Sequence, residues 1–207
     1  MCIRDSDKGV HNINLVTPTH YTDAIVKALE RARLDIPVVW NSSGYDSVES
    51  LRELEGLVQI YMPDFKYTDS ALALRYSAAP DYPEIARAAI FEMFRQVGPF
   101  ELDDDGMLRS GVLLRHLILP GAEDNSRAVI DFVADNFPGD DILFSLMAQY
   151  TPMPDTERFP ELRKTVTAEE NDMLIEYMTQ RGIYNGFWQE PCSATDDMIP
   201  DFDLTGV

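Results

Sequence analysis

The stretch LVQIYMPDFK, residues 57–66, places two opposite charges directly after an apolar run. The apolar residues up to Met62 predict a buried β-strand, and Asp64 and Lys66 follow where that strand ends. Because residues i and i+2 of an extended chain point to the same face, the carboxylate and the amine should leave the strand side by side. Such a pair offers both charges that a zwitterionic small molecule needs.

Short polar clusters also follow other predicted strands. The strands predicted at residues 11–16, 36–40 and 142–147 end in Thr17-Pro18-Thr19, Asn41-Ser42-Ser43 and Ala148-Gln149-Tyr150. A fifth apolar segment, residues 111–119, is interrupted by Arg115 and His116. Parallel strands bring their carboxyl ends to one edge of a sheet, where α/β proteins bind ligands. The sequence therefore predicts a ligand site built from strand ends.

Helical segments alternate with these strands. Apolar residues recur at helical spacing in residues 21–33, Pro83 opens the longest helical segment, residues 83–97, and Thr167 begins a capping box. Five parallel strands with helical connections form either a doubly wound sheet or a barrel. Polar clusters at the carboxyl ends favour the barrel. We predict an α/β fold, a partial (β/α)6 barrel with outer helices.

The sequence predicts three parts. We expect residues 1–8 to form a leader foreign to the domain, residues 9–183 the partial barrel, and residues 184–207 an extended carboxyl-terminal tail packed on the domain. A partial barrel leaves an unpaired strand edge, which predicts marginal stability or aggregation.

Composition limits the possible binding partners and the cellular location of the protein. The 207 residues carry a net charge of -19, with 36 acidic against 17 basic side chains. Nucleic acid is not an expected partner, because phosphate binding needs a basic face. The sequence has neither an apolar run of the roughly 20 residues that a membrane helix requires nor a secretory leader. A cytoplasmic location without membrane contact is predicted.

The two cysteines, Cys2 and Cys192, stand near opposite ends of the sequence. They form no C-x-x-C pair, so neither a disulfide framework nor a metal site made by this chain alone is expected.

Six motifs together resemble a known family. They are HNINLVTPTHY from His11, NSSGYD from Asn41, YMPDFKY from Tyr61, RHLILPG from Arg115, MAQY from Met147 and YNGF from Tyr184. From about Gly9 to the carboxyl end, the sequence resembles the radical SAM branch related to pyruvate formate-lyase activating enzyme.

This resemblance implies a cofactor and a reaction. Such enzymes hold a [4Fe–4S] cluster on a C-x-x-x-C-x-x-C motif and cleave S-adenosylmethionine (SAM) to a 5′-deoxyadenosyl radical. The motif is absent here, and the segment from Met1 to Ser6 resembles a translated adapter. We expect a carboxyl-terminal fragment of a radical SAM oxidoreductase that is itself inactive, whose full-length parent activates a glycyl-radical or other protein substrate and takes electrons from a donor.

The resemblance also implies SAM-binding residues, but no catalytic residue. They are Thr17, Thr19, Asn41, Ser42, Asp64, Lys66, Arg115 and Gln149. Lys66 would pair with the SAM carboxylate, Asp64 would accept from its amino or ribose groups, and Arg115 would lie near the methionine moiety. Gln149 would support the adenine end. The Thr17 cluster replaces a Gly-Gly-Glu turn of related enzymes, and Asn41 replaces an aspartate at a cation site.

Simpler interpretations stand beside these. Asp64 and Lys66 could form an ion pair that ends a strand, and Arg115 could pair with a buried carboxylate. His116 is out of phase with Arg115, which predicts a packed, hydrogen-bonded histidine on the other face.

Two other functions stay open. One is a non-catalytic module that binds SAM or a protein. The other is a cluster-free lyase with Asp64 as base and Lys66 as Schiff-base amine. The nearby carboxylate favours a charged ammonium, which weighs against an amine nucleophile.

Overall fold

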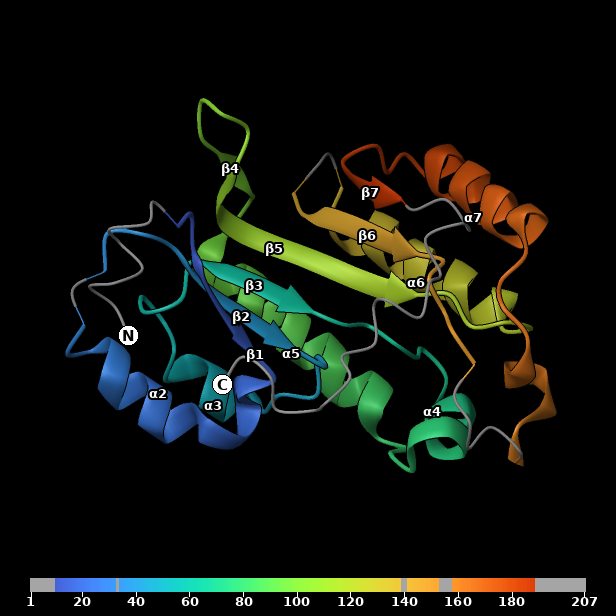
Figure 1. Cartoon of the computed structure of the whole chain (residues 1–207), viewed down its shortest axis with the longest axis horizontal. Coiled ribbons are helices and arrows are strands. Elements are labelled where there is room, and N and C mark those ends of the chain that lie inside the picture. The colour runs from blue at the N-terminus through green and yellow to red at the C-terminus, as the bar shows by residue number, and fades with distance from the viewer. Residues whose placement is uncertain (1–9, 33, 139–140, 153–157, 189–207) are drawn as a thin grey trace.

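Six parallel strands lie in the sheet in the order in which they occur in the chain (Figure 1). The computed structural model describes residues 10–32, 34–138, 141–152 and 158–188. The parallel strands are β1 (Ile13–Val16), β2 (Val38–Ser42), β3 (Ile60–Pro63), β5 (Leu108–Leu117), β6 (Leu143–Met147) and β7 (Gly186–Trp188). A short strand, β4 (Glu101–Leu102), pairs antiparallel with the start of β5.

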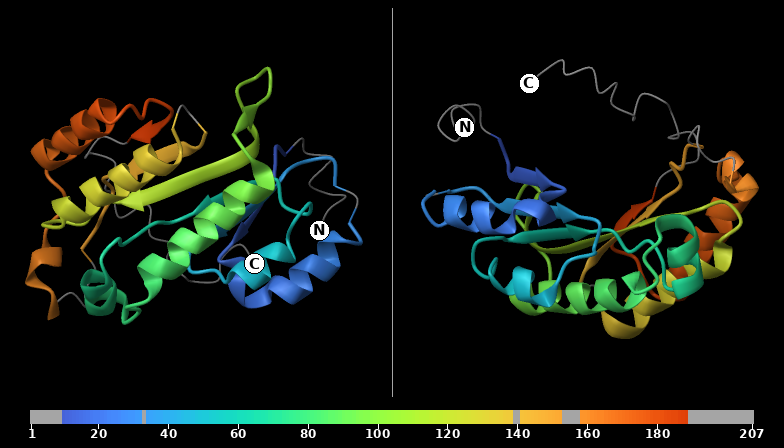
Figure 2. Two further views of the ribbon diagram at one scale, coloured as in Figure 1. Left: turned by 180° about the vertical axis from the view of Figure 1, so that it is seen from behind. Right: turned by 90° about the horizontal axis from the view of Figure 1, so that it is seen from below.

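The helices cover one face of this sheet. They are α2 (Thr22–Leu29), α3 (Val48–Arg52), α4 (Ser70–Ser77), α5 (Tyr82–Val97), α6 (Glu123–Asn136) and α7 (Ala168–Gln180), with the 3-10 turns η1 (Pro18–Tyr21) and η3 (Pro160–Arg163). Figure 2 shows the sheet curving away from them, so that its other face is concave. Strands in sequential order with helices on one face wind in a single direction, as in a barrel. The predicted α/β partial barrel is confirmed.

Strand β5 shows how the faces differ. Val112, Leu114 and His116 are fully buried on the helix face, whereas Leu113 and Arg115 on the concave face are partly exposed. The core therefore lies between sheet and helices, where Trp40, Tyr61 and Phe144 are also buried.

The predicted capping box is present in the structure, whereas the predicted carboxyl-terminal tail begins with a strand. Thr167 forms the capping box at the start of α7, accepting from the backbone N–H of Glu170 while the Glu170 carboxylate accepts from the backbone N–H of Thr167. The segment predicted as an extended tail begins differently, because residues 186–188 pair with β6 as a sixth parallel strand. The predicted leader, the rest of the tail, Cys2 and Cys192 lie outside the described residues.

No helix within the described ranges combines the length and apolar character needed to cross a membrane.

Candidate functional site

The carboxyl ends of β2, β3 and β5 bring four polar side chains together. Arg115 Nη2 lies 2.7 Å from Asp64 Oδ1 and donates to Asn41 Oδ1 at 2.8 Å. Lys66 Nζ lies 3.7 Å from the other Asp64 oxygen. Asp64 therefore sits between two cations contributed by different segments of the chain. We call Asn41, Asp64, Lys66 and Arg115 the strand-end cluster.

Strand register explains why these residues share a face. Asn41 is the register partner of Met62, and Asp64 is that of Arg115. Register partners in a parallel sheet point to the same side, and Asp64 follows Met62 by two residues. Asn41, Asp64 and Arg115 therefore all project from the concave face, which the helices leave open (Figure 2).

The charge of the cluster favours an anionic group. One carboxylate stands against an ammonium and a guanidinium, which leaves one positive charge in excess. The Lys66 side chain is 44% exposed, and its distance from Asp64 is too long for a hydrogen bond. Arg115 Nε is buried and has no hydrogen-bond partner among the described residues. Lys66 thus retains donors for a ligand, whereas the unpaired donor of Arg115 is buried.

Thr19 and Ser42 are held on a different carboxylate, Asp46. Thr19 Oγ1 donates to Asp46 Oδ1 at 2.7 Å and Ser42 Oγ donates to Oδ2 at 2.5 Å, while Trp40 Nε1 lies 3.4 Å from Oδ1. Asp46 is 2% exposed, so this is a buried network. Both hydroxyls bind the Asp46 carboxylate, and their predicted contact with SAM stays a prediction.

The sequence analysis did not select Asp46. The available signal was Ser42, followed four residues later by an aspartate across the Gly44 turn, a spacing at which a side chain can hydrogen-bond within its own loop.

Thr17 and Gln149 stand at the same edge, on either side of the cluster. Thr17 follows β1 in a left-handed conformation, and its backbone N–H donates to Asn41 O at 2.8 Å. Gln149 follows β6, where its Nε2 contacts Met147 Sδ at 3.8 Å. Its Oε1 is buried without a hydrogen-bond partner in the described part of the chain. No hydrogen bond between described residues joins either side chain to the strand-end cluster.

His116 lies on the opposite face from Arg115, as predicted. Its Nδ1 is 2.7 Å from Phe65 O and its Nε2 is 2.9 Å from Ser126 Oγ. A carbonyl oxygen can only accept, so Nδ1 carries a hydrogen. Burial lowers the pKa of His116 from 6.5 to about 4. The prediction of a packed, hydrogen-bonded histidine is confirmed.

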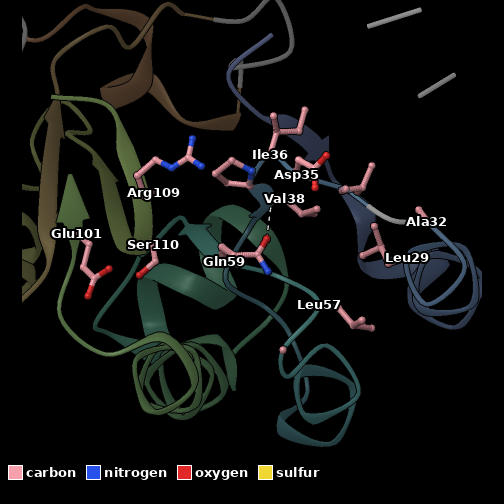
Figure 3. Close-up of a pocket in the computed structure, with 13 residues that line it drawn as sticks. Leu29, Ala32, Asp35, Ile36, Val38, Leu57, Gln59, Glu101, Arg109 and Ser110 are labelled. Carbon is pink, nitrogen blue, oxygen red and sulfur yellow. Dashed lines mark hydrogen bonds between the residues drawn. The ribbon is translucent and has the colours of Figure 1, made fainter. Parts of the chain in front are cut away.

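A cavity of about 430 Å³ lies at the other end of the strands (Figure 3). Its lining includes Val38 and Ser110, near the amino ends of β2 and β5, and the charged side chains of Glu101 and Arg109. Gln59 Oε1 accepts from the backbone N–H of Val38 at 3.0 Å in its wall. None of the eight predicted SAM-binding residues lines it, so the cavity is separate from the strand-end cluster.

No family model matches the sequence. An uncharacterised protein of Methanocaldococcus jannaschii is 29% identical over 168 residues, which cover 80% of this chain and 45% of that protein. The chain thus spans less than half of the curated relative that it matches. A crystal structure of a domain of pyruvate-formate lyase-activating enzyme from Bacteroides vulgatus superposes with a TM-score of 0.61 at 15% identity, covering 86% of this chain and 97% of that domain. The chain therefore has the fold of that activating-enzyme domain.

Proposed function

We propose that this chain binds SAM at the carboxyl edge of its sheet, as the SAM-binding part of a radical SAM oxidoreductase of the activating-enzyme type. One observation carries the proposal. The Asp64 carboxylate, held 2.7 Å from Arg115 and 3.7 Å from Lys66, projects from the concave face at the strand ends. A fold shared with a domain of pyruvate-formate lyase-activating enzyme supports the same assignment.

The strand-end cluster suits the amino-acid part of SAM. Lys66 can donate to the ligand carboxylate, Arg115 adds a second positive charge beside it, and Asp64 can accept from the ligand ammonium. Asn41 keeps Arg115 oriented through the 2.8 Å hydrogen bond. Thr17 and Gln149 stand on either side of the cluster, where they would contact the rest of the ligand. Thr19 and Ser42 support the site through Asp46.

The residues present do not fit a [4Fe–4S] cluster. Three cysteines are needed for the family motif, and this sequence has two, Cys2 and Cys192. Among the described residues no group of three or more His, Cys, Asp or Glu side chains could hold a metal ion. Reductive SAM cleavage, a protein substrate and an electron donor are proposed only for a longer protein that adds the cluster ligands.

Isothermal titration with SAM and with its uncharged-sulfur analogue S-adenosylhomocysteine tests this function. We expect both ligands to bind, and Asp64→Asn and Lys66→Met to weaken binding at least about tenfold, because each removes a charge-assisted hydrogen bond. Lys27→Met, on the exposed surface of α2, is the matched control and should bind like the wild type. Absence of binding by the wild type, or equal binding by all variants, would overturn the proposal.

A cluster-free binding module is the second candidate, because the strand-end cluster offers both charges to a ligand without a metal. Anaerobic reconstitution with iron and sulfide separates the two candidates when it is performed on a longer form of the protein. A brown chromophore with formation of 5′-deoxyadenosine on reduction supports the enzyme, whereas SAM binding without either result supports the module.

A further inference from the structure

The backbone around Asp64 and Lys66 is held by groups from four other segments. The N–H of Asp64 donates to Ser42 O at 3.0 Å, and the N–H of Phe65 donates to Arg115 O at 2.8 Å. These two bonds continue the sheet ladder past the end of β3. Beyond Phe65 the ladder stops, and buried side chains replace it.

Tyr82, at the start of α5, is the first of these side chains. Its hydroxyl accepts from the N–H of Lys66 at 2.9 Å. The same hydroxyl lies 2.9 Å from Ser43 O and 2.9 Å from Asp64 O, so it donates to one of these carbonyls. Tyr82 is 4% exposed, and burial raises its pKa far above 10. The hydroxyl therefore stays protonated and serves as donor and acceptor together.

Asn125, in the first turn of α6, completes the arrangement. Its Nδ2 donates to Lys66 O at 2.9 Å, and its Oδ1 accepts from the N–H of Thr68 at 2.9 Å. Asn125 is 5% exposed. The backbone N–H of Lys66 thus donates to Tyr82, and its backbone carbonyl accepts from Asn125. Between them, His116 Nδ1–H donates to Phe65 O.

We propose that Tyr82 and Asn125 are positioning residues, which hold the backbone from which the Asp64 and Lys66 side chains reach a ligand. The inference rests on the proposed SAM site and adds residues that do not touch the ligand. The gap of 3.7 Å between the two charges exceeds a hydrogen bond, so their own contact does not fix it. The hydrogen bonds instead fix the backbone from which both side chains extend, and a preorganised backbone loses less entropy when a ligand binds.

A matched control lies beside Tyr82. Tyr67 is also buried, and its ring centroid is 5.5 Å from that of Tyr82. Its hydroxyl is 3.0 Å from Ser77 Oγ in α4, away from the backbone of residues 64–66. Tyr67→Phe therefore removes one buried hydroxyl without releasing Lys66.

The experiment compares Tyr82→Phe with Tyr67→Phe in two measurements. The first is S-adenosylhomocysteine binding by titration calorimetry, for which we expect about tenfold weaker binding in Tyr82→Phe and no change in Tyr67→Phe. The second is amide hydrogen exchange at Lys66 by NMR, normalised to global stability from urea unfolding. We expect at least about tenfold faster exchange in Tyr82→Phe alone, because only that variant removes the acceptor of this N–H.

The outcomes separate this inference from the proposed function. Binding that is equal in the wild type and Tyr82→Phe overturns the positioning role and leaves the SAM site intact. Absence of binding in the wild type overturns the SAM site. The exchange rate of the Lys66 amide then tests the role of Tyr82 by itself, and equal rates in Tyr82→Phe and Tyr67→Phe would overturn it. If Tyr82→Phe does not fold, Asn125→Asp tests the same point. That change keeps the acceptor for Thr68 and removes the donor to Lys66 O, and unchanged binding in it overturns the inference.

Discussion

Arg115 and His116 are consecutive residues of β5, and their side chains lie on opposite faces of the sheet. Arg115 Nη2 is 2.7 Å from Asp64 in the strand-end cluster, whereas His116 is fully buried towards the helices and bonded to Ser126. The strand alternation that gives Arg115 to the concave face gives His116 to the core. One residue therefore serves a candidate ligand site while its neighbour stabilises the loop behind that site.

Replacement of Arg115 by lysine should weaken ligand binding more than it weakens the fold. Lysine keeps the charge, but its ammonium lacks the fixed plane of the guanidinium, which holds Nη2 against both Asn41 and Asp64. We expect about tenfold weaker S-adenosylhomocysteine binding by titration calorimetry. Arg109→Lys is the matched control, because Arg109 lies on the same strand but lines the cavity at the other end. Equal loss of affinity in both variants would contradict a specific role for Arg115.

His116 should make the protein less stable as the pH falls from 6.5 to about 4. The folded state holds the pKa of His116 at about 4, against 6.5 for an ordinary histidine. Below pH 6.5 the unfolded chain binds a proton that the folded chain does not, so the free energy of unfolding decreases, and the loss ends below the folded pKa. Between pH 7 and pH 5 the loss is about 2 kcal/mol.

Urea unfolding at several pH values measures this effect. His116→Gln should lose the pH dependence between 7 and 5, whatever its stability at neutral pH. His20→Gln, at an exposed position in η1, should keep it. A wild-type free energy of unfolding that stays flat over this range would rule out the proposed protonation behaviour.

The sequence could predict the fold because the strands carry a repeated signal. Apolar runs identified β1, β2, β3, β5 and β6, and all of these except β5 were predicted to end in a polar cluster. The alternation in residues 111–119 placed Arg115 and His116 correctly. Strand β7 was not predicted because three residues are too few to show a two-residue period. Strand β7 forms because the edge of β6 is available for pairing, and that edge exists only once the chain has folded.

The site could be predicted only in part, for a related reason. Spacing two residues apart placed Asp64 beside Lys66, but the partnership of Asp64 with Arg115 spans 51 positions in the chain and depends on strand register. Tyr82 and Asn125 looked like ordinary helix residues. Their hydrogen bonds go to the backbone of Lys66, which is distant in the chain, and no sequence pattern indicates such a contact.

Ser42 should affect stability rather than affinity. Its hydroxyl donates to the buried carboxylate of Asp46 and accepts from the N–H of Gly44 at 3.1 Å. Ser42→Ala leaves part of that carboxylate unsatisfied, which should cost about 1–3 kcal/mol of unfolding free energy. Urea unfolding and S-adenosylhomocysteine titration check both parts, and we expect the dissociation constant to change less than about twofold. A large loss of affinity with unchanged stability would instead place Ser42 at the ligand.

Gly44, in the loop after β2, should tolerate replacement by alanine less well than Gly56. It has a φ of 75°, and a Cβ added there would lie 2.1 Å from Asp64 O, the carbonyl that Tyr82 also contacts. Gly56 has a φ of 79° but nothing within 4 Å of an added Cβ, so Gly56→Ala measures the backbone cost alone. We expect about 1 kcal/mol of lost stability for Gly56→Ala. For Gly44→Ala we expect a further 1–3 kcal/mol or so, because the methyl group must displace the Asp64 backbone. Urea unfolding gives both values, and S-adenosylhomocysteine binding should weaken in Gly44→Ala only. Equal destabilisation of the two variants would mean that the loop yields without moving Asp64.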